Sequence, residues 1–543
     1  MRSLQGPKYP TAKCSASIAL GLIALLLTMG IAIAAASPRL QDLSQSVPIA
    51  TDQEGSAPSP ATARRFVAAH WAAITDQRRD VLDLSRSDVV RILRGMTRDW
   101  SALGGASQPI TVYLPRSQVR MIAESFGFAV AGLSVQLLPD DELLNQVAAT
   151  PGSFALVDTR QLRLGVLALT VDGHDPYRDP GFESPLRQLR WVEAPRTPAD
   201  LDRFTAALQG LPQQFDPVGV AITGELIPVR CTNHVLAQLD DYDAMFDGVR
   251  SELIAADLAV AALEHPLISD GELTPCEATV VFTGSHRAVP AIANAGLDVL
   301  FTIGNHMKDC WGGCSGTAVL EETLGRLSKA GIVTAGAGEN LDAARAPTVV
   351  RVDTRSGPVR FAFLGYDTIA PWYHATEDKP GTAPLDVEYL RDDVADALLI
   401  ADHVIVGANW GVEYTSNPVF YQRQLAGVAI EAGASLLVGH HPHWVQAVEH
   451  LGDALVAYSM GNFVFDQAWS VPTTQGMVME LGFTAERLLG YRIRPVVIRA
   501  HSNRLPWIYR PEFVDPATAG RPILDRVWKA QDRLPARADG TVD

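Results

Sequence analysis

From Asp216 onward the chain alternates apolar runs with helical segments, and several of the apolar runs end abruptly in a side chain able to bind a metal ion. The runs are typical of strands buried on both faces of a sheet, and residues 316–330 and 417–433 have helical spacing. This alternation predicts an α/β fold. Ligands of open α/β folds collect at the carboxyl ends of the strands, so we expect the polar strand ends to lie together.

Five strand ends carry metal-binding side chains of three kinds: carboxylate, amide and imidazole. VAITGE ends in Glu225, VAALEHP contains Glu264, VLFTIGNH ends in Asn305-His306, VIVGAN ends in Asn409, and LLVGHHPH ends in His440, His441 and His443. A single glutamate at a strand end is usually a solvated cap, and Gly-Asn-His is usually a turn. Three imidazoles within four residues are harder to explain in that way. The set as a whole predicts a site for Mn, Fe or Zn.

Residues 216–505 resemble the CapA-type family, the capsule and poly-γ-glutamate biosynthesis proteins, which belong with the calcineurin-like metallophosphoesterases. The matching segments occur in the family's order and include TGELIPVR, DLAVAALEHP, AVPAIANAGLDVLFTIGNHMKD, FAFLGYD, NWGVEY, GASLLVGHHPHWVQAVE and YSMGNFVFD. The resemblance implies an α/β fold made of a two-sheet sandwich flanked by helices, with metals held at the strand ends.

The resemblance implies two divalent ions, Mn, Fe or Zn, which activate a water and hold a phosphoryl oxygen. The implied metal ligands are Glu225, Glu264, Asn305, Asn409, His441 and His443. Three positions depart from the family pattern: Glu225 replaces Asp, Ala262 replaces Asn, and Asn409 replaces a histidine. Because an amide oxygen is a poorer ligand than imidazole for Zn or Mn, we expect one metal position to be weak or empty.

Three further residues have roles implied by the family. His306 is expected to protonate a leaving oxygen or to stabilise developing charge, and Asp309 to orient His306 or to cap its loop. Arg230 is expected to bind an anionic group, with a surface salt bridge as the alternative. His440 is expected beside the metal ligands rather than among them.

A smaller α/β lobe is predicted over residues 63–200, with strands near 110–114, 153–157 and 166–171 and a helix near 90–96. LSRSDVVRILRGMTRDWSALGG, QPITVYLPR and TPGSFALVDTRQLRLGVLALTVDG resemble part of a phosphate-type periplasmic solute-binding protein. That family's Ser-Gly-Thr anion loop is missing from PRSQVRMIAES. The resemblance therefore favours a spacer over a ligand-binding lobe.

The N-terminus predicts export, because basic residues precede an uncharged apolar stretch over 16–36. Residues 1–36 are a cleaved signal peptide or an uncleaved membrane anchor, 37–62 a linker, and 506–543 a C-terminal tail. Four of the five cysteines follow the export segment, where disulfides are stable. We expect the pairs Cys231–Cys276 and Cys310–Cys314, with a structural zinc site as the alternative.

The formal net charge of −16 argues against nucleic-acid binding. Three functions remain: a capsule or poly-γ-glutamate assembly factor working with a membrane-bound polymer synthase, a stand-alone metal-dependent phosphoesterase or hydrolase, and a metal-depleted binding module. The expected substrate is an anionic polymer or a phosphoester, and whether the chain is an enzyme stays open. The expected location is the outer face of the cytoplasmic membrane or the extracellular space, with membrane attachment through the N-terminus if it is uncleaved.

Overall fold

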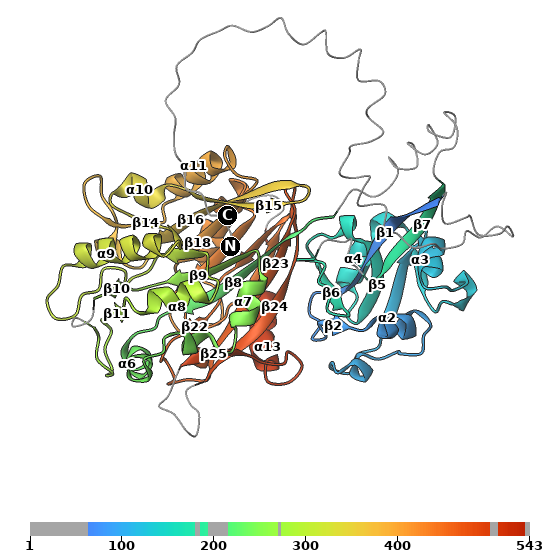
Figure 1. The fold of residues 1–543 in the computed structure, drawn as a ribbon, viewed down its shortest axis with the longest axis horizontal. Coiled ribbons are helices and arrows are strands. Elements are labelled where there is room, and N and C mark those ends of the chain that lie inside the picture. Colours follow the sequence, from blue (N-terminus) through green and yellow to red (C-terminus); the bar gives the residue numbers. More distant parts are fainter. Residues whose placement is uncertain (1–62, 180–184, 194–214, 270–272, 500–508, 538–543) are drawn as a thin grey trace, which may run out of the picture.

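The computed structural model describes residues 63–179, 185–193, 215–269, 273–499 and 509–537, for 63–68 and 188–193 the backbone alone. The expectations for the export segment, the linker 37–62 and most of the bridge after residue 193 lie outside these ranges. Figure 1 shows two units side by side, a larger one containing β8 to α13 and a smaller one containing β1 to β7. Within the described ranges, none of the helices has the length and apolar character required to cross a bilayer.

The smaller unit is built on one sheet with the strand order β2-β6-β1-β5-β3-β4, and β7 pairs with β1. Its strands are β1 (Ala63–Asp76), β2 (Asp83–Leu84), β3 (Thr111–Pro115), β4 (Gln136–Leu138), β5 (Ser153–Asp158), β6 (Val166–Val171) and β7 (Arg187–Glu193). Its helices are α2 (Arg86–Leu93), α3 (Val119–Ser125) and α4 (Asp140–Ala149). Helix α2 begins at a Ser85 capping box and buries Val89, Ile92 and Leu93. The strands expected near 110, 153 and 166 are all present.

The larger unit contains the two expected sheets. The first has the order β13-β12-β9-β8-β23-β24-β25, with β22 also paired to β8, and the second has the order β15-β16-β18-β19-β21-β20. The first sheet consists of β8 (Val218–Leu226), β9 (Leu258–Leu263), β12 (Val299–Thr302), β13 (Val333–Ala335), β22 (Asn462–Val464), β23 (Gln475–Phe483), β24 (Leu488–Arg499) and β25 (Arg510–Phe513). The second consists of β15 (Thr348–Thr354), β16 (Gly357–Asp367), β18 (His403–Asn409), β19 (Leu436–His440), β20 (Val448–Leu451) and β21 (Ala454–Ala457).

Apolar side chains from both sheets form one core between them, which includes Ile222, Phe301, Phe363, Ile405 and Val438. Helices cover the outer faces, so each sheet is buried on both sides (Figure 1). Against the first sheet lie α6 (Arg230–Leu239), α7 (Arg250–Ala255), α8 (Ala288–Asn294) and α9 (Gly316–Lys329). Against the second lie α10 (Leu341–Arg345), α11 (Val387–Leu398) and α12 (Phe420–Glu431). The expected α/β sandwich is thus confirmed.

The described part of the C-terminal tail belongs to this sandwich. Strand β25 extends the first sheet, and helix α13 (Arg521–Asp532) adds Ile523, Leu524, Val527 and Trp528 to the core between the sheets. The three apolar positions 523, 524 and 527 have the spacing of one helix face, and this packing explains why the helix forms.

A buried ion cluster joins the two units. Arg492 of β24 contacts Asp175 of the smaller unit at 3.0 Å and Glu480 of β23 at 3.1 Å. It also donates a hydrogen bond to the carbonyl of Ala168. Tyr177 packs in the same place against Gly490, where an added Cβ would lie 2.5 Å from the phenol oxygen. The contact between the units is therefore both charged and closely packed.

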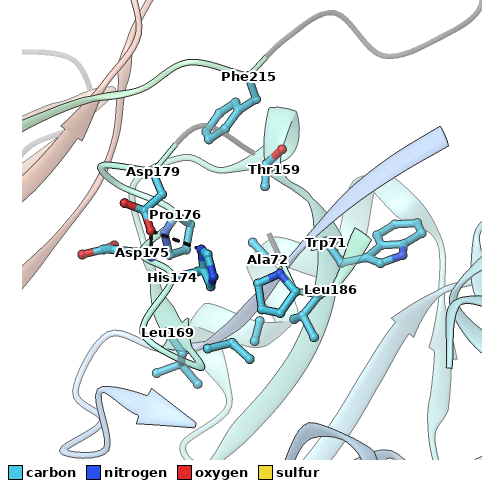
Figure 2. A pocket seen from close by; sticks show the side chains of 13 residues that line it. Trp71, Ala72, Thr159, Leu169, His174, Asp175, Pro176, Asp179, Leu186 and Phe215 are labelled. Carbon is cyan, nitrogen blue, oxygen red and sulfur yellow. Dashed lines mark hydrogen bonds and ion pairs between the residues drawn. The ribbon is translucent and has the colours of Figure 1, made fainter. Parts of the chain in front are cut away.

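A small pocket lies in the smaller unit, and Figure 2 shows it from close by. Trp71, Leu169, Leu186 and Phe215 line it, and the His174–Asp179 pair, 3.6 Å apart, lies at one side. The cavity volume is about 20 Å³. That is room for about one water molecule, so this pocket is too small for an anion with its hydration. Whether the lobe is a spacer stays a prediction.

Candidate metal centre

Three acidic and imidazole side chains of the larger unit meet at the ends of its strands. Glu225 on β8, Glu264 directly after β9 and His443 in the loop after β19 each place a potential ligand atom within 4.8 Å of the others. All three are buried. Within the described residues this is the one such cluster, and each member was predicted from the sequence. Because β8 and β9 are parallel neighbours, their carboxyl ends bring the two glutamates together.

Glu264 has an unusual environment for a carboxylate. Its side chain is 2% exposed, and neither carboxylate oxygen has a hydrogen-bond partner in the structure. Burial, together with the negative charge of Glu225, raises the pKa of Glu264 well above its ordinary value. Buried charges are normally paired or bound to metal. Two free oxygens facing another carboxylate therefore fit a divalent cation.

Glu225 and His443 form a charged pair inside the site. His443 Nδ1 is in ion-pair contact with Glu225 and lies 3.0 Å from Asn462 Oδ1. Burial alone would lower the pKa of His443, but the Glu225 carboxylate raises it to about 9. Burial by itself would raise the pKa of Glu225. The positive charge of His443 outweighs burial and holds the pKa of Glu225 below its ordinary value. A cation entering the site would replace the proton of His443 as the counter-charge.

The backbone of the His-His-Pro-His loop is strained in a way that aims its side chains. His441 has φ of 92° and His443 has φ of 58°, conformations uncommon for residues other than glycine. Tyr414, whose N–H donates to the carbonyl of Pro442, has φ of 59°. Such strain is often concentrated at functional sites. Here the strained loop lies against the strand ends. The Glu225 carboxylate holds it there by accepting the His441 backbone N–H at 2.6 Å.

Gly304 explains how the loop after β12 approaches this cluster. Its φ is 132°, and an added Cβ would lie 2.4 Å from the Cγ atom of Glu264. Only glycine allows this backbone conformation and this approach. The next residue is Asn305, so the glycine lets Asn305 reach the site.

The other three expected ligands, Asn305, Asn409 and His441, form a hydrogen-bonded network beside the cluster. Asn305 Oδ1 lies 3.2 Å from Asn409 Nδ2 and 3.2 Å from His441 Nδ1. Asn409 Nδ2 also donates to Asp367 Oδ1 at 2.8 Å. The Asn409 amide nitrogen thus faces both oxygens, and the histidine that the family has at this place would present no such pair of donors. The weakening of one metal position and the assignment of these three residues as ligands both stay predictions.

Asp367 is a site residue that we did not predict. It ends β16 in register with Asn409, and Asn409 is in register with His440, so three adjacent strands end at one level. Its carboxylate accepts the backbone N–H of Ala370 and lies 3.4 Å from His374 Nε2. The motif FAFLGYD ends in this residue, so the same strand-end rule could have found it. Its role is to hold the Asn409 amide.

Two histidines of the loop are electrically neutral at physiological pH. Burial, with the positive charge of His443, lowers the pKa of His441 to about 4. Burial lowers the pKa of His440 to about 4 as well, and neither ring nitrogen of His440 has a partner. The His440 ring packs near Phe301 with 6.5 Å between centroids. His440 therefore lies in the core under the site, as expected, and His441 is in the form that can ligate a metal.

His306 and Asp309 form a second feature of the site. Asp309 Oδ2 lies 2.7 Å from His306 Nδ1 and accepts the N–H of Phe282, and Asp309 Oδ1 accepts the hydroxyl of Tyr373 at 3.0 Å. The His306 ring packs on Phe282 with 4.1 Å between centroids. Of the two roles expected for Asp309, this geometry supports the orientation of His306. Nε2 is then the nitrogen left for proton exchange.

Arg230 is a buried residue that is bound by other parts of the protein. Its guanidinium forms an ion pair with Asp466 and donates to the carbonyl of Thr279 at 2.8 Å. The rings of Phe282 and Phe465 lie on it, each 5.0 Å from the guanidinium carbon. Arg230 is therefore ion-paired inside the protein, and the expected surface position of that salt bridge is wrong. Its role in substrate binding stays a prediction.

Two disulfides lie next to these residues. Cys231, which follows Arg230, is bonded to Cys276, and Cys310, which follows Asp309, is bonded to Cys314. This is the expected pairing, and the zinc alternative for the cysteines is excluded. Both bonds brace loops that carry predicted site residues.

Comparison with known proteins agrees with this picture. Residues 219–467 match the family model described as Bacterial capsule synthesis protein PGA_cap. The chain is 30% identical over 257 residues to the PGA biosynthesis protein CapA of Bacillus subtilis (strain 168), which covers 47% of this chain and 65% of that protein. The chain therefore spans slightly less than two thirds of that relative.

Two solved structures show a distant likeness. A 5'-nucleotidase from Candida albicans is 8% identical with a TM-score of 0.31 and covers 58% of each chain. An ABC-type phosphate transport receptor from Vibrio cholerae is 16% identical with a TM-score of 0.23 and covers 27% of this chain and 66% of that one. Likenesses at this level decide neither fold nor function. The family match is much more specific, and residues 219–467 are similar to the bacterial capsule synthesis family that includes CapA of Bacillus subtilis.

Proposed function

We propose that this chain is an exported, metal-dependent factor in the assembly of a capsule polymer of the poly-γ-glutamate type. The observation that carries the metal part is the Glu264 carboxylate, buried beside Glu225 with both oxygens unpartnered. The polymer part is supported by the family match over residues 219–467 and by the name of the Bacillus subtilis relative. Export is supported by the two disulfides, which persist in oxidising compartments.

The ligands of the proposed ion are Glu225, Glu264 and His443. Two carboxylates and one imidazole form a donor set suited to Mn, Fe or Zn. A divalent ion bound there would act as a Lewis acid and lower the pKa of a bound water. We propose one strongly held ion and, at most, a weak second position beside Asn305 and Asn409, because the Asn409 amide nitrogen already donates to Asp367 and Asn305.

The His306–Asp309 pair favours a hydrolytic role at this site over a purely binding role. Asp309 holds Nδ1 of His306, which fixes the imidazole orientation and leaves Nε2 as the atom that exchanges a proton. His306 would then give a proton to the leaving group when a bond in the polymer or in a phosphoester carrier is cleaved. The proposed partner on the membrane is the polymer synthase, and the proposed location is outside the cytoplasmic membrane.

Metal binding is the experiment that tests the proposal. The chelated full chain is titrated with Mn and with Zn, and the content is measured by elemental analysis after gel filtration. We expect about one equivalent in the wild type and in the matched control His234→Ala, whose side chain is exposed on α6. The double variant Glu264→Gln with His443→Ala should retain little metal. Equal metal content in that variant and in the wild type would remove the site assignment.

Catalysis is tested separately with the metal-loaded protein. Hydrolysis of γ-glutamyl oligomers and of a chromogenic phosphodiester is measured for the wild type, His306→Ala and Asp309→Asn. Loss of a general acid typically lowers the rate by about 10²- to 10⁴-fold, without changing metal content. A rate that is unchanged in His306→Ala would leave the chain as a metal-binding assembly factor without catalysis at this pair.

A further inference from the structure

A groove along helix α13 concentrates positive charge on an acidic protein. Its volume is about 550 Å³. It is lined by Ser416, Asn417, Ala517, Thr518, Arg521, Pro522, Asp525, Arg526, Lys529, Ala530 and Arg533. The lining therefore holds four cationic side chains and one carboxylate, whereas the whole chain has a net charge of −16. Attraction of an anion to such a protein has to come from a local basic site of this kind.

Two of the four cations are not neutralised by the protein. In the described part of the chain, neither Arg526 nor Arg533 makes an ion pair. Arg526 donates to the neutral side chain of Gln475 at 2.7 Å, and its guanidinium carbon lies 5.9 Å from the centre of the Trp444 ring. Burial without a neighbouring carboxylate lowers the pKa of Arg526. A half-buried guanidinium of this kind would be stabilised by an incoming anion.

The other two cations share a single carboxylate. Arg521 contacts Asp525 at 2.7 Å, and Lys529 lies 3.9 Å from the other oxygen of Asp525. Arg521 also lies 3.4 Å from Asp80 of the smaller unit. The Lys529 side chain is 70% exposed. Lys529 and Arg533, one helical turn apart, thus present positive charge along the groove.

Two segments of chain link residues at the groove to residues at the metal centre. Trp444, which contacts Arg526, directly follows the ligand His443. Ser416 and Asn417 belong to the same loop as Tyr414, whose ring stacks on His443 with 6.0 Å between centroids. Gln446 holds this loop by donating to the carbonyl of Thr415 at 3.0 Å. The loop over 414–417 thus contributes residues both to the groove lining and to the packing on His443.

We propose that this groove binds an extended polycarboxylate strand and leads it to the metal centre. Guanidinium groups bind carboxylates through two parallel hydrogen bonds, and three of the four cations are arginines. Nucleic acid is a poorer fit, because the described residues that line the groove include no aromatic side chain to stack on bases. The inference rests on the proposed function, since the strand is taken to be the polymer on which the metal centre acts.

Binding of a fluorescent γ-linked glutamate oligomer of about ten residues to the full chain tests the proposal. Anisotropy is measured for the wild type and for Lys529→Glu with Arg533→Glu. The matched control is Lys329→Glu with Arg391→Glu, which makes the same charge change at exposed positions on α9 and α11 outside the groove. We expect the groove variant to bind about tenfold more weakly or worse, and the control to stay within about twofold. Wild-type affinity should fall as salt is raised.

A second variant, Arg526→Gln, removes the half-buried charge with little change of shape and should also weaken binding. Equal affinities of the groove variant and the control would overturn the proposal. Tighter binding of inorganic polyphosphate or of single-stranded DNA than of the glutamate oligomer would overturn the polycarboxylate assignment. Circular dichroism and thermal unfolding confirm that each variant is folded before it is compared.

Measuring metal content together with oligomer binding distinguishes a failure of the groove inference from a failure of the proposed function. If the groove variant loses the oligomer but keeps its metal, both stand. If the wild type binds the oligomer through the groove but takes up no metal, the groove stands and the proposed metal function fails. If metal binds at Glu264 but the groove variant binds the oligomer normally, the groove inference fails and the proposed function stands.

Discussion

Replacement of Glu264 by glutamine is the sharpest test of how this site is built. In the metal-free protein the wild-type carboxylate is buried, has no hydrogen-bond partner and faces Glu225. Glutamine has nearly the same shape and carries no charge. Ionisation of Glu264 destabilises the folded wild type, and Glu264→Gln has no ionisable group at this position. We therefore expect Glu264→Gln to stabilise the metal-free protein at neutral pH.

The pH dependence follows from the raised pKa of Glu264, whose ordinary value is 4.5. The folded state holds this proton more tightly than the unfolded state does. This tighter proton binding stabilises the folded state fully below pH 4.5. The stabilisation is lost as the pH rises toward and through the raised pKa of Glu264. Each pKa unit of displacement corresponds to about 1.4 kcal/mol. At pH 8 the variant should therefore be more stable than the wild type, and the difference should close near pH 4.5.

Metal should reverse the order of the two proteins. A ligand at one hundred times its Kd stabilises a folded protein by about 2.7 kcal/mol. The wild type should gain this amount with Mn or Zn, and Glu264→Gln should gain little because it has lost a charged ligand. Urea denaturation with and without chelator, at several pH values, measures both effects, and exposed Glu486→Gln serves as the control.

The reasoning would be refuted if metal-free Glu264→Gln were less stable than the wild type at pH 8. That result would mean that the carboxylate is satisfied as an anion within the protein. An equal gain from metal in both proteins would place the ion elsewhere. The control variant should follow the wild type under all conditions.

Three further predictions follow from other parts of the structure. Metal uptake at pH 7 should release at least one proton, because His443, with a pKa of about 9 beside Glu225, has to lose its proton to ligate; calorimetry in buffers of different ionisation enthalpy measures it, and no release would mean that His443 is not a ligand. Arg492→Met should cost about 1–3 kcal/mol of unfolding free energy, because Asp175 and Glu480 lose a shared buried partner at the contact between the units and keep only Arg178 and Arg494; an unchanged unfolding free energy by urea denaturation would contradict this. Replacing Cys231 and Cys276 together by alanine should cost about 4 kcal/mol, as expected for a disulfide closing a loop of 45 residues; an unchanged thermal midpoint would show that the bond does not constrain the unfolded chain.

Much of the architecture could be predicted because the relevant signals are local in the sequence. Apolar runs such as 258–263 and 436–439 mark strands buried on both faces, and the side chain that ends each run marks the edge where ligands gather. The same rule identifies Glu225, Glu264 and His443 as candidate ligands from the amino-acid sequence alone. It was not applied to the run ending in Asp367, although that run has the same form.

Other features depended on contacts between residues far apart in the chain. Arg230 pairs with Asp466, 236 positions later, and no local sequence pattern predicts this partner. Helix α13 was expected within a tail, but its apolar face completes the core between the sheets. The basic groove exists only because α13 packs beside the loop that carries Ser416 and Asn417.

The sequence by itself determined the fold class and the set of residues from which a metal site could be made, and it favoured the disulfide pairs that the structure contains. These follow from periodicity, spacing and residue chemistry, which act over short stretches of chain. Only the tertiary structure decided which members of that set meet. It brings Glu225, Glu264 and His443 within ligand distance and turns the Asn409 amide toward Asp367. The physical reason is that strand order, register and backbone strain position these side chains, and they are determined by the packing of the whole domain.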